Sequence, residues 1–127
     1  MIYFFIKEKI KFYEDCSMLS GFSLRNKYSK TLGINKLYVS ILWLKDIVIK
    51  YDFIIICIDT LYISSEISNE VYKYFSEMYS IDKKNIYFNA SHTHSSPPLE
   101  KNFDKNTNQK FVTNLKLQIL SMISGLS

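Results

Sequence analysis

Both histidines of the chain, His92 and His94, lie two residues apart in a polar segment that follows a short apolar run. In extended backbone, side chains two residues apart point to the same side, so the spacing predicts that both imidazoles face one way. Two imidazoles at the end of a strand can both bind a metal ion, or one can bind the metal while the other transfers protons. The spacing alone is equally compatible with two solvated histidines that have no chemical role.

A carboxylate, Asp59, follows a second apolar run, residues 53–58. A nearly continuous apolar run of this length is typical of a central strand that is buried on both faces. Residues 37–44 form another strong strand pattern, and the short separation between the two runs predicts an antiparallel hairpin. Asp59 is therefore expected where the second strand of this hairpin leaves the sheet, although it can equally be an ordinary strand-end carboxylate.

Topology predicts that Asp59 approaches the two histidines. Residues 66–79 carry apolar side chains at helical spacing, with Ser64 or Ser65 as the expected N-cap, and residues 86–90 predict the next strand. Strand, helix and strand in this order make the strands at 53–58 and 86–90 parallel. Their carboxyl ends then lie at the same edge of the sheet, where open α/β sheets bind ligands.

The remaining segments complete the expected architecture. Residues 2–13 predict a strand, residues 14–33 a loop and polar connector, residues 100–110 a polar flexible segment, and residues 110–124 a helix that stops near Gly125. The predicted fold class is α/β, a mixed sheet in which an antiparallel hairpin is followed by a βαβ unit and a C-terminal helix. We expect residues 1–127 to form a single, incomplete domain.

Composition excludes several classes of function. The net charge is +4, but the basic residues are scattered and only Arg25 is arginine, which argues against nucleic-acid binding. Cys16 and Cys57 form no disulfide or metal-binding motif, and Cys57 is expected to be a buried small apolar residue. The apolar residues 1–6 are too few for a signal peptide or a membrane span, so a soluble, cytoplasmic chain is expected.

The histidine segment also resembles a known signature. Residues 89–97, Asn-Ala-Ser-His-Thr-His-Ser-Ser-Pro, are similar to the Ala-Thr-His-Thr-His-Ser-Gly-Pro motif of neutral/alkaline non-lysosomal ceramidases. Those enzymes are zinc amidohydrolases that cut the amide bond of ceramide and related N-acyl lipids. Further similarities follow the same order along the chain, in the loop at 20–25, the Leu-Tyr strand at 37–42 and the strand end at 56–61.

The resemblance implies a role for each candidate site residue. His92 would be a zinc ligand, and His94 would be a catalytic residue that lines the site close to the reacting amide. Asp59 would orient a histidine or line the site, and Arg25 would line it from its loop. The chain departs from the family at Asn35-Lys36, where the family has His-Asp-Pro before the Leu-Tyr strand, and it has no third histidine.

The resemblance therefore predicts an N-terminal fragment of a ceramidase-like zinc amidohydrolase with an incomplete metal site. The family's other ligands, a histidine, a glutamate and a tyrosine, come from later in a longer chain. We expect a lipid amide as the substrate and a second polypeptide as a possible source of the missing ligands. The alternatives are a non-catalytic remnant and a small α/β interaction module, and an exposed sheet edge would favour self-association.

Overall fold

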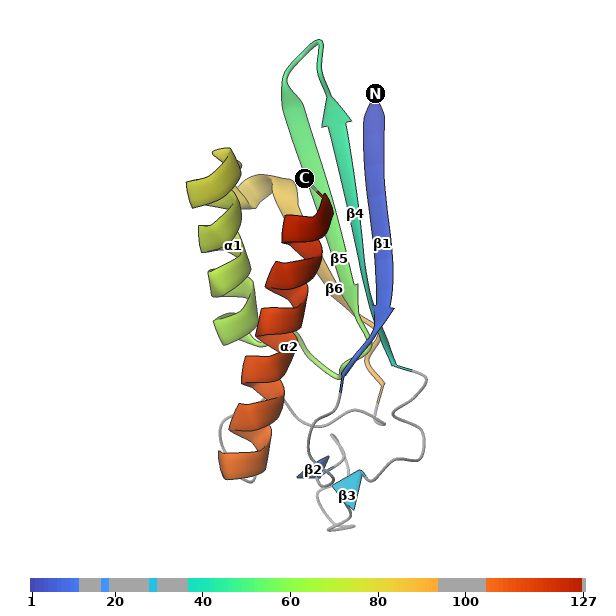
Figure 1. The fold of residues 1–127 in the computed structure, drawn as a ribbon, viewed down its shortest axis with the longest axis vertical. Helices are drawn as coiled ribbons and strands as arrows, with labels where there is room; N and C mark the ends of the chain where they lie inside the picture. The colour runs from blue at the N-terminus through green and yellow to red at the C-terminus, as the bar shows by residue number, and fades with distance from the viewer. Residues whose placement is uncertain (12–16, 19–27, 30–36, 94–104, 127) are drawn as a thin grey trace.

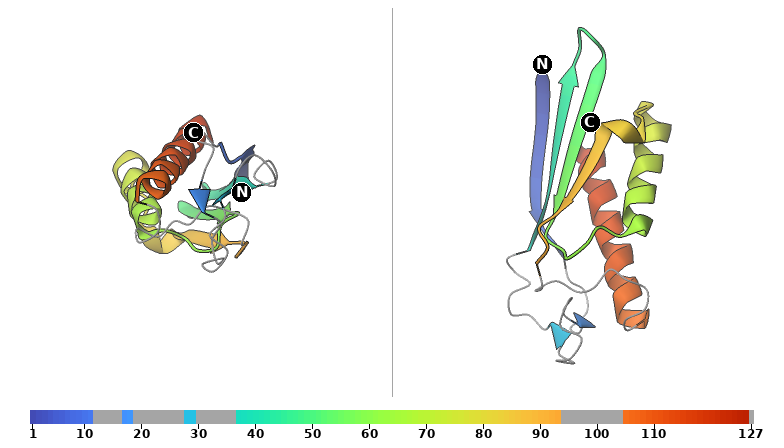
Figure 2. Two further views of the ribbon diagram at one scale, coloured as in Figure 1. Left: turned by 90° about the horizontal axis from the view of Figure 1, so that it is seen from below. Right: turned by 180° about the vertical axis from the view of Figure 1, so that it is seen from behind.

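A computed structural model describes residues 1–11, 17–18, 28–29, 37–93 and 105–126 of the chain (Figure 1). Its main sheet has four strands in the order β1-β4-β5-β6. These strands are β1 (Ile2–Lys9), β4 (Tyr38–Asp46), β5 (Tyr51–Ile58) and β6 (Ile86–Ala90). The other elements are the short pair β2 (Ser17–Met18) and β3 (Tyr28–Ser29), the helices α1 (Ser65–Tyr79) and α2 (Lys105–Leu126), and the 3₁₀ turn η2 (Lys83–Asn85). Both helices cover the same face of the sheet (Figure 2).

The pairing of the main sheet confirms the predicted mixed α/β fold. β4 pairs antiparallel with β5, so that Leu42 lies opposite Ile55, while β5 pairs parallel with β6, so that Ile58 lies opposite Ala90. β1 adds antiparallel to the other side of β4. The connection from β5 to β6 runs through α1, as expected for parallel neighbours.

A tight turn closes the hairpin between β4 and β5. One carboxylate oxygen of Asp46 accepts hydrogen bonds from the backbone amides of Val48 (3.0 Å) and Ile49 (3.3 Å). Lys50 takes the left-handed conformation, with φ 55°. The indole nitrogen of Trp43 donates to Asp52 across the hairpin at 2.8 Å, which fixes the register near the turn.

The hydrophobic core lies between the sheet and the two helices. Alternate residues of β4 and β5 point to the helical side, and α1 and α2 each contribute one apolar stripe. Trp43 packs edge-on against Phe75 and Tyr79, with ring centroids 5.4 and 5.0 Å apart. The fully buried residues at the centre of this core are Val39, Ile41, Ile54, Ile56, Ile58, Ile67, Val71, Phe75, Leu115, Ile119, Met122 and Ile123.

Polar side chains hold the helices in register with the sheet. Ser64 caps α1, as predicted, by accepting a hydrogen bond from the backbone amide of Glu66. Gln118 of α2 is buried, accepts from the amide of Lys11 at 3.0 Å and donates to the carbonyl of Lys9 at 2.7 Å. β1 ends at Lys9, earlier than residue 13, although the amide of Ile10 still donates to the carbonyl of Leu37 at 2.9 Å.

Three further expectations are corrected. α2 begins at Lys105 and not near residue 110, because a helix anchored by the buried residues Phe111 and Val112 extends at little cost. Cys57 is partly exposed, since it lies on the sheet face without helices. The segment at 14–33, predicted to be irregular, contains β2 and β3.

Among the described helices, none combines the length and apolar character that a membrane span requires.

The packing of the core predicts that two substitutions in α1 will differ in their effect on the free energy of unfolding. Phe75→Ala should lower the free energy of unfolding by about 3–5 kcal/mol, because it leaves a cavity beside Trp43. Met78→Ala, at an exposed position of α1, should change it by less than about 0.5 kcal/mol. Urea unfolding followed by Trp43 fluorescence measures both values. Equal losses would contradict the packing described for α1.

Candidate functional site

The carboxyl ends of β5 and β6 meet at one edge of the sheet, as topology predicted (Figure 1). The carbonyl oxygen of Ile58 accepts hydrogen bonds from two backbone amides, those of Thr60 (2.9 Å) and Ser91 (3.1 Å). The two segments that leave the sheet are therefore joined at their first residues. These hydrogen bonds fix where the segment after β6, which contains His92, lies relative to the segment after β5.

His92 is held by backbone groups of the segment after β5. Its amide donates to the carbonyl of Thr60 at 2.9 Å, and its ring nitrogen Nδ1 lies 3.1 Å from the carbonyl oxygen of Leu61. A carbonyl can only accept, so this contact requires the proton on Nδ1, and in the neutral ring Nε2 is then the acceptor nitrogen. Metal-ligating histidines are oriented in this way, by a hydrogen bond from the other ring nitrogen.

The backbone at His92 is left-handed, with φ 63°. β6 ends at Ala90, and His92 does not have the extended backbone from which we expected His92 and His94 to point to the same side. The cause is the hydrogen bonding to Thr60 and Leu61, which turns the chain back toward the end of β5. Left-handed backbone is unfavourable for a residue with a side chain, and such strain is common at functional sites.

Sequence reasoning missed three residues that shape this site. Thr60 is fully buried and donates from its hydroxyl to the carbonyl of Tyr62 at 2.8 Å, which closes the bend after β5. Leu61 supplies the carbonyl that orients His92. Tyr62 packs its ring edge-on to the imidazole, with centroids 5.7 Å apart. The position of Thr60 directly after an apolar strand could have been noticed in the sequence. The carbonyl of Leu61 could not, because every residue has a backbone carbonyl and no sequence pattern marks this one.

Asp59 lies at the same sheet edge and binds the start of β4. Its carboxylate oxygen Oδ2 accepts from the amide of Tyr38 at 2.9 Å, and its own amide donates to the carbonyl of Tyr38 at 3.0 Å. This reciprocal pair continues the β4–β5 ladder by one residue. The proposed role of Asp59 in orienting a histidine stays a prediction, since the contact described for Nδ1 of His92 is with Leu61.

Two of the predicted site residues, His94 and Arg25, lie outside the described residues, and their roles stay predictions. Within residues 1–11, 37–93 and 109–126, no group of three or more His, Cys, Asp or Glu side chains is placed to hold a metal ion. The described part of the site thus offers one oriented imidazole. A catalytic zinc site needs three protein ligands.

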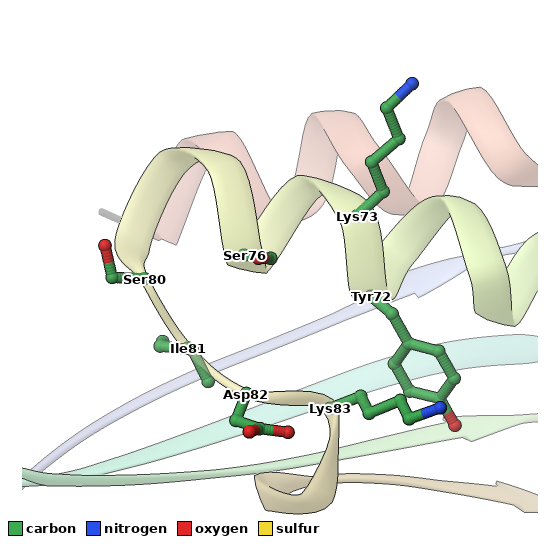
Figure 3. Close-up of a pocket in the computed structure, with 7 residues that line it drawn as sticks. All are labelled: Tyr72, Lys73, Ser76, Ser80, Ile81, Asp82 and Lys83. Carbon is green, nitrogen blue, oxygen red and sulfur yellow. The ribbon is translucent and has the colours of Figure 1, made fainter.

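Three surface pockets in the described structure lie away from His92. One is formed by the end of α1 and the turn that follows it, and Figure 3 shows the residues that line it. There the Asp82 carboxylate caps η2 by accepting from the amide of Lys84 at 3.0 Å. The other two pockets lie beside α2, around Thr113, and at the β4–β5 turn, around Asp46. None of the three is lined by Asp59 or His92.

Comparison with known proteins supports the fold and nothing finer. No protein-family model matches the chain, and no curated protein matches it. Among solved structures, the neutral ceramidase from Pseudomonas aeruginosa is similar, with a TM-score of 0.67 and 15% sequence identity. The match covers 92% of this chain and 20% of the ceramidase chain. The chain therefore has a distantly ceramidase-like fold and spans about a fifth of the length of that protein.

The contact between Asp59 and Tyr38 makes a stability prediction. Asp59→Ala should lower the free energy of unfolding by about 1–3 kcal/mol, because the partly buried amide of Tyr38 loses its acceptor. Asp59→Asn keeps a side-chain oxygen and should lose clearly less. Urea unfolding of the two variants beside the wild type provides the comparison. Indistinguishable losses in both variants would argue against this role of the carboxylate oxygen.

Proposed function

We propose that this chain is the N-terminal part of a ceramidase-like zinc amidohydrolase and carries part of its metal site. The observation that carries the proposal is the orientation of His92 at the carboxyl edge of the sheet, with Nδ1 directed to the carbonyl of Leu61. The ceramidase-like fold supports it, because the similarity extends over 92% of the chain. The order of the motifs along the sequence is a second, independent support.

Under this proposal, each candidate site residue would have a distinct role in zinc binding or in lining the site. His92 would hold zinc through Nε2, while Leu61 and Thr60 keep its ring and backbone in place. His94 would line the site near the amide, and Asp59 and Arg25 would lie around it. When bound, zinc would lower the pKa of a water molecule and polarise the amide carbonyl of an N-acyl lipid. Further ligands would come from a second polypeptide or from additional sequence.

The donors found among the described residues limit what the chain can be proposed to do alone. One described imidazole, even with His94 beside it, falls short of the three ligands that hold catalytic zinc. The arrangement fits a half-site that binds zinc weakly and becomes catalytic after completion. A second candidate function, a non-catalytic interaction module, is favoured by one separate observation, the apolar sheet face without helices.

Zinc binding tests the half-site directly. We expect the metal-stripped chain to bind zinc weakly in isothermal titration calorimetry, and His92→Ala to reduce the affinity by more than about tenfold. His94→Ala, measured in parallel, tests the second imidazole. Ser91→Ala is the matched control, because it changes the same exposed segment and removes no imidazole. Equal zinc affinity in the wild type and His92→Ala would contradict the proposal.

A measurement of amide hydrolysis by the isolated chain distinguishes a partial zinc site from a complete enzyme. The isolated chain, loaded with zinc, should not hydrolyse a fluorescent N-acyl sphingosine above the rate of the His92→Ala variant, because the described residues hold fewer than the three ligands of a catalytic zinc site. Release of the labelled fatty acid measures the reaction. Hydrolysis by the wild type that His92→Ala abolishes would overturn the half-site and indicate that the chain is a complete enzyme.

A further inference from the structure

Tyr62 lies beside the imidazole of His92, on the segment that leaves β5. The two ring centroids are 5.7 Å apart and the ring planes meet at 76°, an edge-on arrangement that is favourable for aromatic pairs. Three consecutive residues of this segment therefore contact three parts of one histidine. The carbonyl of Thr60 binds its backbone amide, the carbonyl of Leu61 lies at its Nδ1, and the ring of Tyr62 packs against its ring.

The segment that carries Tyr62 is tied down on both sides of this residue. Before it, the fully buried Thr60 donates from its hydroxyl group to the backbone carbonyl of Tyr62 at 2.8 Å. After it, Ser64 caps α1 by accepting from the backbone amide of Glu66. The backbone of Tyr62 is therefore held between the end of β5 and the start of α1, which keeps its ring at His92.

Core packing does not account for the position of the Tyr62 side chain. The exposed fraction of Tyr62 is 53%, whereas those of Thr60 and Leu61 are 0% and 7%. Within the described part of the chain, the hydroxyl group of Tyr62 makes no hydrogen bond, so its contact with His92 is made by the ring. A large, half-exposed ring is thus held against an imidazole instead of entering the core.

An exposed imidazole is not oriented by one hydrogen bond to a carbonyl alone. His92 is exposed, and water competes for the hydrogen bonds of an exposed group. Rotation of the ring by half a turn about its Cβ–Cγ bond would exchange Nδ1 for a carbon atom at the carbonyl of Leu61. A second ring packed edge-on against the imidazole favours one of these two orientations, because the contact differs between them.

We propose that Tyr62 is a positioning residue, whose ring holds the imidazole of His92 with Nδ1 at the carbonyl of Leu61. In the neutral imidazole, this orientation makes Nε2 the acceptor nitrogen, which is the atom that would bind zinc. The part of Tyr62 in zinc binding rests on the proposed function. Its part in orienting the ring does not, and is measurable without metal.

The tautomer of His92 in the metal-free chain tests the orientation. Heteronuclear NMR of the ring nitrogens, at alkaline pH and in a His94→Ala background, detects His92 alone. The Nδ1–H tautomer should predominate, and Tyr62→Ala should lower the ratio of the Nδ1–H to the Nε2–H tautomer about two- to tenfold, the range expected for one aromatic pair. Tyr62→Phe keeps the ring and should retain the ratio.

Tyr51→Ala is the matched control for this measurement. It removes a tyrosine of similar exposure, 44%, at the opposite end of β5, and should leave the ratio unchanged. An unchanged ratio in Tyr62→Ala would overturn the proposal. Equal losses in Tyr62→Ala and Tyr62→Phe would also overturn it and assign the effect to the hydroxyl group. Circular dichroism verifies folding, and Tyr62→Leu, which has no ring, replaces Tyr62→Ala with the same expected loss if that variant does not fold.

Zinc titration separates this inference from the proposed function. With His94 present, Tyr62→Ala should weaken zinc binding about two- to tenfold in isothermal titration calorimetry, while Tyr62→Phe should retain it. Zinc binding that is weakened by His92→Ala and unchanged by Tyr62→Ala would overturn the positioning role and leave the proposed function intact. Zinc binding that His92→Ala leaves unchanged would contradict the proposed function alone, because the tautomer ratio is measured without zinc.

Discussion

The position of β5 between an antiparallel and a parallel neighbour is the constraint on which the rest of the structure depends. Its inward side chains, Ile54, Ile56 and Ile58, are fully buried against the helices. Its ladder fixes both β4 and β6. Where it ends, the carbonyl of Ile58 binds the segments that lead to Leu61 and His92. A shift of β5 by one residue would move its buried side chains to the other face and separate these groups.

The candidate site shows how backbone groups at a sheet edge can orient one imidazole. The left-handed His92 is held by backbone groups of Thr60 and Leu61, and the carbonyl of Leu61 lies at its ring nitrogen Nδ1. In the neutral ceramidase that is similar, the matched fold makes up 20% of a longer chain. A local core of this kind can form from its own residues, whereas a complete metal site requires ligands from several segments.

The same alternation that builds the core also gives the sheet a second apolar face, which neither α1 nor α2 covers (Figure 2). In a strand, every second residue points to the opposite side, and β5 carries apolar side chains on both sides. The helices cover one side, which leaves Phe53 and Ile55 partly exposed on the other. An apolar strand pattern of this kind is typical of sheets that are covered on both faces. Cys57 illustrates the consequence, because a residue expected in a core lies instead on this surface.

The sequence by itself determined the order and type of the main elements, because hydrophobic period, strand-forming residues and the Ser64 cap are local signals. It also predicted that Asp59 and His92 reach the same sheet edge, since parallel pairing follows from strand-helix-strand order. Only the tertiary structure decided that Asp59 binds Tyr38 and that Leu61 orients His92. Those contacts join residues far apart in the chain, through backbone atoms that every residue shares, and no sequence pattern marks them.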